Sequence, residues 1–243
     1  MIRKEAPFID IHTHQSGEGY FTYGIHPWSF DGMSLPSSQS VSPLGLQGAL
    51  TNLTLLEKYL QENKIVAIGE TGLDRLHKDT YDLQIEFFEK HILLSEQYQK
   101  PLIIHNVKAT ADILRLHKKH QPRQVWIIHG FNGNTEESRQ LTERGLYLSV
   151  GESIFYPNRK ITKTLSSLPL EYLFLETDTS EKTIQQVYAK ASELLNLPLD
   201  ALKEQIFANF ARLNLNLWKT GNNAPGCSSV TMALICLDGA MCS

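Results

Sequence analysis

Short apolar runs alternate with helical stripes along most of the chain, and this alternation limits the possible folds more than any other feature. Seven runs have the length of a strand and are rich in β-branched or aromatic residues, and several are continuous rather than alternating. Continuous apolar runs are typical of parallel strands that are buried on both faces. The seven runs begin at Phe8, Tyr20, Ile65, Leu102, Val125, Leu146 and Tyr172.

Helical patterns separate most of these runs. The clearest extends from about Tyr81 to Tyr98, and Asn134 with Glu137 has the spacing of a capping box. Other stripes surround Leu56, Ile113, Val187 and Ile206, and Asn52 is expected to cap the first of these. Strands that alternate with helices predict an α/β fold with a parallel sheet. A chain of 243 residues suits a (β/α)8-type TIM barrel.

Seven strands are one fewer than such a barrel needs. The residues between His14 and Tyr20 are too few for a helix and a strand, so we expect a barrel that is distorted by a missing βα unit. Ser29–Gly48, rich in Ser, Pro and Gly, is expected to be a surface loop.

The last residues have a different composition. We expect a single barrel over residues 1–218 and an atypical C-terminal tail over residues 219–243, which has no helical period and holds all three cysteines. The first interpretation is a tail without regular structure, and the alternative is that Val230–Leu237 forms a strand in place of the missing unit. Because the body lacks cysteine, a disulfide framework is excluded there and a cytoplasmic location is expected.

Composition excludes several classes of function. The formal net charge is -3, so bulk positive charge cannot drive binding to nucleic acid. No apolar run approaches the length of a membrane span, so no membrane association is expected. The start of the chain lacks a basic region followed by an apolar one, so we expect no secretion signal. No protein partner can be inferred.

Histidines and carboxylates recur where the apolar runs end. His12 and His14 are two residues apart, so in a strand they point to one side. Four more such residues each follow a different apolar run: Glu70, His105, His129 and Asp178. The carboxyl ends of the strands of a parallel barrel meet on one face, where catalytic residues lie. The pattern therefore predicts a metal site.

The mixture of imidazole and carboxylate suits Zn²⁺, Mn²⁺, Fe²⁺ or Ni²⁺ better than Mg²⁺, which prefers oxygen ligands. Six ligands are more than one tetrahedral ion needs, so two divalent ions are expected. Glu70 is the natural carboxylate to bridge them, since its two oxygens can each face one ion.

The motifs at these positions resemble those of the TatD family of metal-dependent deoxyribonucleases. The resemblance rests on Asp10-Ile11-His12-Thr13-His14, Gly24-Ile25-His26-Pro27, Gly69-Glu70-Thr71-Gly72-Leu73-Asp74, Ile103-Ile104-His105, Ile128-His129-Gly130 and Glu176-Thr177-Asp178. The motifs occur in the family's order, and the match extends from about Phe8 to Leu215.

The resemblance implies a role for each residue. His12, His14 and Asp178 would hold one ion, His105 and His129 would hold the second, and Glu70 would bridge. Asp178 would also accept the proton of the attacking water. Glu176 and Asp74 would support the ligands from behind. His26 would contact a substrate phosphate, and the alternative is a histidine packed beside Pro27.

The chain departs from the family in its substrate-binding segments. The Ser-Arg that usually follows the fourth motif is replaced by Asn106-Val107-Lys108, so Lys108 is the candidate phosphate contact. The Pro-rich loop that usually follows Glu-Thr-Asp is short here. The resemblance nevertheless implies a phosphodiesterase or deoxyribonuclease that acts on DNA ends. The alternative is a hydrolase of a small amide, ester or lactone on the same barrel, and a non-catalytic metal or nucleic-acid binder is a third hypothesis.

Overall fold

The computed structural model describes residues 5–15, 19–30, 43–213, 215 and 231–236. The chain divides into two compact units, each of which is described by itself. The first unit contains residues 1–20 and 127–236, and the second contains residues 21–126 and 237–243.

Eight strands lie in the described residues, and seven of them coincide with the seven predicted runs. The strands are β1 (Phe8–Thr13), β2 (Tyr20–Tyr23), β3 (Ala67–Asp74), β4 (Leu102–Val107), β5 (Trp126–Ile128), β6 (Tyr147–Val150), β7 (Leu173–Leu175) and β8 (Thr231–Cys236). The α-helices are α1 (Pro43–Gln61), α2 (Tyr81–Tyr98), α3 (Thr110–His120), α4 (Thr135–Thr142), α5 (Lys160–Thr164), α6 (Ile184–Leu195) and α7 (Leu199–Arg212). Short 3-10 helices are η1 (Pro27–Phe30), η2 (Lys78–Thr80), η3 (Glu152–Phe155), η4 (Leu165–Ser167) and η5 (Leu170–Tyr172). Strands and helices alternate, which confirms the α/β class and the strand number of a (β/α)8-type TIM barrel.

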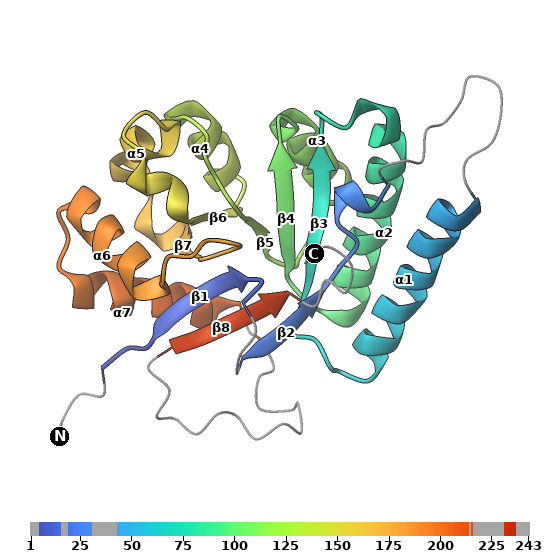
Figure 1. The fold of residues 1–243 in the computed structure, drawn as a ribbon, viewed down its shortest axis with the longest axis horizontal. Helices are drawn as coiled ribbons and strands as arrows, with labels where there is room; N and C mark the ends of the chain where they lie inside the picture. The colour runs from blue at the N-terminus through green and yellow to red at the C-terminus, as the bar shows by residue number, and fades with distance from the viewer. Residues whose placement is uncertain (1–4, 16–18, 31–42, 214, 216–230, 237–243) are drawn as a thin grey trace. The chain divides into compact units, whose positions relative to one another are not determined.

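The second unit is built on three neighbouring parallel strands, β2, β3 and β4. Helix α2 packs against β3 and β4 (Figure 1). A cluster beside these strands joins Ile25 and Phe30 to Phe87 of α2, all almost fully buried. This packing fixes η1, because Phe30 anchors the 3-10 turn in the core.

The first unit contains β5 to β8 together with β1. Strand β7 pairs with β6, and β6 pairs with Ile127 and Ile128 of β5, all in parallel. A bridge between Thr13 and Asp178 ties the end of β1 to the turn after β7. Helices α6 and α7 contact β1 and β7. Asn134 caps the start of helix α4, and its side chain accepts from the N–H of Glu137, so the predicted capping box is confirmed.

Strand β8 corrects the preferred expectation for the tail. Thr231–Cys236 pair with β1 in parallel (Figure 1), and Phe8 faces Thr231. A Cβ on Gly19 would lie 2.7 Å from the carbonyl oxygen of Ala233, so β8 also contacts the segment that leads into β2. The interpretation without regular structure is wrong for these residues, and the alternative strand is confirmed. Apolar side chains explain it, because Leu234 and Ile235 are buried in the core.

Three local predictions also need correction. Ser29 lies in η1 and α1 starts at Pro43, so the two ends of the predicted Ser29–Gly48 loop are helical, while residues 31–42 lie outside the described part. Asn52 lies inside α1 and does not cap it. Strand β3 continues past Glu70 to Asp74, because its later residues pair with β4 in spite of two glycines.

Candidate functional site

Strand β1 and the turn after β7 bring together three of the predicted ligands in the first unit. The Nε2 atoms of His12 and His14 lie 3.9 Å and 3.6 Å from Oδ1 of Asp178. All three donor atoms lie within 4.8 Å of one another. His12 is buried and the carboxylate of Asp178 is 36% exposed, so one side of the group is open to solvent. Two imidazoles and a carboxylate that converge in this way are a fitting donor set for a divalent transition metal.

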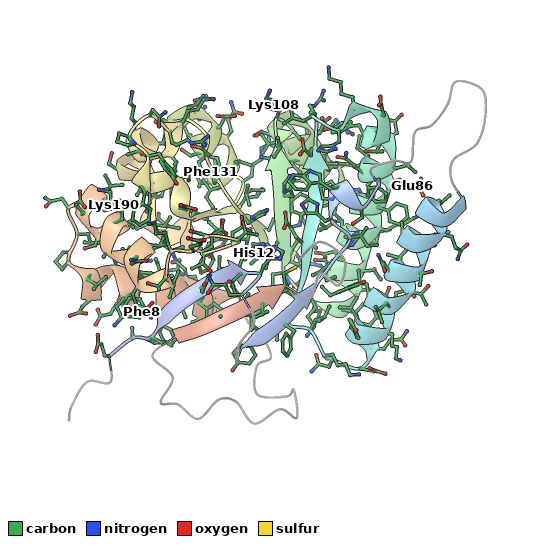
Figure 2. The ribbon with its side chains drawn as sticks, viewed as in Figure 1. Phe8, His12, Glu86, Lys108, Phe131 and Lys190 are labelled. Carbon is green, nitrogen blue, oxygen red and sulfur yellow. The ribbon has the colours of Figure 1, made fainter. Side chains whose placement is uncertain are left out.

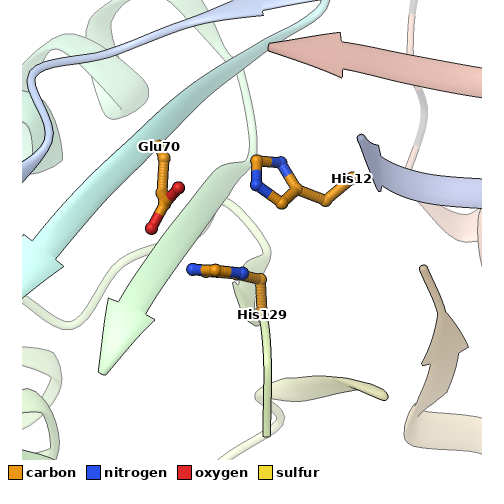
Figure 3. A group of neighbouring side chains, drawn as sticks. All are labelled: His12, Glu70 and His129. Atoms are coloured by element: carbon orange, nitrogen blue, oxygen red, sulfur yellow. The ribbon is translucent and has the colours of Figure 1, made fainter. Parts of the chain in front are cut away.

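His129 joins this group from the end of β5. Its ring centroid lies 4.7 Å from that of His12 (Figure 3). Its Nδ1 lies 3.7 Å from Oε1 of Glu176, and the same oxygen accepts a 2.6 Å hydrogen bond from the N–H of Gly130. Burial alone would raise the pKa of Glu176, but the neighbouring His129 outweighs it and the pKa is lowered. Glu176 is thus a buried carboxylate behind His129, in the place expected for a supporting group.

The second unit holds a group of side chains around Glu70. Oε1 of Glu70 lies 2.7 Å from Nδ1 of His105 and 3.0 Å from Nε2 of His26. These three side chains also have donor atoms that fit one metal ion. The sequence analysis predicted Glu70 and His105 as ligands but assigned His26 to a substrate phosphate. His26 comes just after β2, at the end of an apolar run, as the other predicted ligands do. This position was the sequence signal that could have grouped it with Glu70 and His105.

Two features of β3 support His105. Gly72 has a φ of +142°, and a Cβ there would lie 2.2 Å from the carbonyl oxygen of His105, so only glycine lets β3 approach β4 at this point. Asp74 places Oδ2 3.5 Å from Nε2 of His105 and accepts a 2.9 Å hydrogen bond from Nε1 of Trp28. Burial opposes ionisation of Asp74, but these hydrogen bonds from His105 and Trp28 hold its pKa well below the usual range.

The candidate substrate contacts of the second unit lie in η1 and just after β3 and β4. Lys108 follows β4 (Figure 2), with an exposed side chain and a left-handed backbone, φ +53°. Arg75 follows β3, and its guanidinium is paired with Asp112. Trp28 is 39% exposed, and its indole lies 5.6 Å from the ring of His77.

Asp10 and Thr177 were not predicted to have a role of their own. Asp10 is a buried acid in β1, and burial raises its pKa to about 7 in spite of two hydrogen bonds from Thr177. Asp10 could have been singled out in the sequence because it is an acidic residue inside an otherwise apolar run. No local pattern marked Thr177 as its partner.

The model of the family described as TatD related DNase matches residues 9–214 of this chain. A curated relative, the uncharacterized metal-dependent hydrolase YjjV of Escherichia coli, is 29% identical over 206 residues, which are 78% of this chain and 74% of the relative.

Solved structures agree with the family match. The crystal structure of Escherichia coli YjjV, described as a TatD homologue, has a TM-score of 0.65 at 26% identity and covers 80% of this chain and 76% of that one. A TatD-family hydrolase from Entamoeba histolytica has a TM-score of 0.63 at 17% identity, covers 86% of this chain and 98% of that one, and supports the fold alone. Among the described helices, none has the length and apolar character that crossing a membrane requires.

Proposed function

The chain belongs to the TatD family of metal-dependent hydrolases, and on this premise we propose that it cleaves phosphodiester bonds at the ends of DNA. The observation that carries the proposal is the group formed by His12, His14 and Asp178, whose donor atoms lie within 4.8 Å of one another in a single unit. Histidine and carboxylate ligands with one open side are typical of hydrolytic metal centres.

The proposed ligands divide into two sets. His12, His14 and Asp178 would hold one divalent ion, His105 and His129 would hold a second, and Glu70 would serve both. For Glu70, His105 and His129 the assignment follows the family's motifs. Divalent ions held by these residues would supply Lewis acidity, which lowers the pKa of a coordinated water and polarises a phosphate.

Asp178 is the proposed base for the attacking water. Its carboxylate is 36% exposed, whereas the carboxylate of Glu176, two residues earlier, is 1% exposed. A general base must reach the proton that it takes. The exposed carboxylate of Asp178 can do so, and the buried carboxylate of Glu176 instead holds His129.

The proposed contacts to substrate come from the second unit. Lys108 pairs with a phosphate of the DNA strand, and His26 is the second candidate for such a contact. The exposed face of Trp28 offers a surface on which a base can stack, and its hydrogen bond to Asp74 keeps the indole in place. A free DNA end suits a protein of net charge -3 better than a duplex does.

One observation favours a different substrate on the same groups. Arg75 directly follows Asp74 and is a candidate to contact a phosphate. Its guanidinium is already in an ion pair with Asp112 and is therefore not available to a phosphate. A small amide, ester or lactone needs no such cation, so hydrolysis of one of these remains the second candidate function.

Parallel assays separate the two candidates. Protein loaded with Mn²⁺ or Zn²⁺ is incubated with end-labelled single-stranded DNA, with closed circular duplex DNA and with a panel of lactones and esters. We expect cleavage from the ends of the single strand, abolished by Asp178→Asn and unaffected by Asp200→Asn, which changes an exposed acid of α7 in the same unit. Turnover of a lactone without cleavage of any DNA would replace the first candidate by the second.

Lys108 has its own matched control. Lys108→Ala should raise the KM for single-stranded DNA about ten- to a hundred-fold, because a charge-assisted hydrogen bond to phosphate contributes roughly 1.5–3 kcal/mol. Lys118→Ala, which removes an exposed lysine of α3, should not change it. Efficient cutting of closed circular DNA that is unaffected by Lys108→Ala would contradict the proposed end preference.

A further inference from the structure

A buried carboxylate in β1 holds the residue that precedes Asp178. The N–H of Thr177 donates to Oδ1 of Asp10 over 3.0 Å, and its hydroxyl donates to Oδ2 over 2.7 Å. Asp10 is 5% exposed and Thr177 is 2% exposed, so both hydrogen bonds are shielded from water. A single residue thus satisfies both oxygens of the buried acid.

A second threonine, Thr13, extends this hydrogen-bond network beyond Thr177. The hydroxyls of Thr13 and Thr177 lie 2.8 Å apart and share a hydrogen bond. The hydroxyl of Thr13 also accepts from the N–H of Gln15, whose side-chain amide donates to the carbonyl of Ser180 over 2.9 Å. We call these five residues, Asp10, Thr13, Gln15, Thr177 and Ser180, the β1–β7 clamp. It joins two segments that are far apart in the sequence.

A bulge in β1 makes this arrangement possible. Asp10 faces Ala233 and Thr13 faces Ile235, so β1 uses three residue steps where β8 uses two. In a regular strand, residues three apart point to opposite faces. The bulge allows Asp10 and Thr13 to reach the same hydroxyl, and bulges of this kind re-aim side chains beside functional sites.

The three donors of the first unit lie between members of the clamp along the sequence. His12 and His14 lie between Asp10 and Gln15, on either side of Thr13, and Asp178 lies between Thr177 and Ser180. Asp178 has a φ of +52°, a left-handed conformation that is unfavourable outside glycine and needs support from its surroundings. Its backbone is held by hydrogen bonds to His12 and His14 on one side and by the clamp at Thr177.

We propose that Asp10 and Thr177 are positioning residues, which hold Asp178 against His12 and His14 so that the three donors can bind one metal ion. The inference rests on the proposed function, since it takes these donors to be ligands. A buried carboxylate is costly where it serves packing alone. A role in orienting the metal ligands explains why the buried carboxylate of Asp10 lies two residues before His12.

Thr177→Val tests the clamp because it keeps the shape and the backbone N–H and removes only the hydroxyl. Mn²⁺ alone is the probe, and its dissociation constant is measured by chelator competition on folded protein. We expect Thr177→Val to weaken binding of an ion about 10- to 100-fold, the usual effect of removing a partner behind a ligand. Thr177→Ser, which restores the hydroxyl, should bind within about threefold of the wild type.

Val187→Ala is the control for lost stability alone. Val187 is fully buried in α6 of the same unit and lies outside the clamp. It should lower the melting temperature and leave Mn²⁺ affinity unchanged. If Thr177→Val binds Mn²⁺ as the wild type does, or if Val187→Ala weakens binding equally, the positioning role is overturned.

Two further outcomes remain decisive. If Thr177→Val does not fold, Thr13→Val takes its place, since it removes the hydroxyl that joins Thr13 to Thr177 and to the N–H of Gln15. Unchanged affinity in that variant overturns the proposal, and a tenfold loss supports it. If the wild type itself binds no Mn²⁺, the ligand group of the proposed function fails, and the inference fails with it. That failure is visible without any variant.

Discussion

One hydroxyl satisfies two backbone groups of the strand that carries His12. The hydroxyl of Tyr188, in α6, accepts from the N–H of Ile9 and donates to the carbonyl of Ile9, both over 3.1 Å. The N–H and C=O of one strand residue point to the same edge. Tyr188 therefore supplies the hydrogen-bond partner for Ile9 on the edge of β1 that faces away from β8. Burial raises the pKa of Tyr188 far above neutrality, so the proton needed for the second bond is always present.

Tyr188→Phe keeps the ring, and with it the 5.1 Å edge-on contact to Phe8, and removes only the hydroxyl. Two buried backbone groups then lose their partner. Each unsatisfied group costs about 1–3 kcal/mol, so the free energy of unfolding should fall by about 2–6 kcal/mol. For a chain of this size the melting temperature should fall by about 4–12 °C.

Urea unfolding measures the energy, and hydrogen exchange shows where it is lost. Peptides that contain Ile9 should exchange faster in Tyr188→Phe, while peptides from α2 should not change. Tyr156→Phe is the matched control, because its exposed hydroxyl donates only to Glu152 and its loss should cost less than about 0.5 kcal/mol. If the two variants lose the same free energy, the argument from the buried backbone groups is wrong.

Three further predictions concern pH, the C-terminal strand and one glycine. Burial lowers the pKa of His91 to about 4, and its ring accepts from the N–H of Ile25. Between about pH 6.5 and pH 4 the unfolded chain therefore binds a proton that the folded chain does not. As the pH is lowered over that range, the free energy of unfolding should fall by about 3 kcal/mol. Urea unfolding at several pH values should show that His91→Gln removes this contribution to the pH dependence of stability. Truncation after Lys219 removes β8 and its buried apolar side chains, so calorimetry should show that the free energy of unfolding falls by more than about 3 kcal/mol. An unchanged melting temperature would contradict the pairing of β8 with β1. Gly72→Ala forces a Cβ into the backbone of the next strand, so urea unfolding should show a loss of about 3 kcal/mol, whereas Gly145→Ala at an open turn should cost less.

The sequence predicted the elements whose signals are local. The stripe from Tyr81 to Tyr98 is helix α2, and Asn134 with Glu137 is a capping box. Apolar runs mark buried parallel strands whatever their partners are, so seven strands could be placed without knowing how they pair.

Features that depend on distant partners could not be predicted in this way. Thr231–Cys236 has the composition of a strand, but only pairing with β1 distinguishes it from an irregular tail. The bulge after Asp10 breaks the two-residue period on which the argument for β1 relied. His26 stays a predicted substrate contact, and its 3.0 Å approach to Glu70 joins two strands in a way that no spacing along the chain fixes. In each case the deciding contact joins residues that are far apart along the chain.

The pairing of β1 with β8 has a consequence for the order of folding. Residues 21–126, which form nearly all of the second unit, are continuous in sequence, so their contacts can form while the rest of the chain is still being made. In the first unit β1 must wait for β8, and a contact of such long range closes a very large loop and slows folding. The strand that carries His12 is thus among the first parts to be synthesised and among the last to acquire its neighbour. Until β8 pairs with it, the edge of β1 that Thr231–Cys236 covers is open to pairing with other chains.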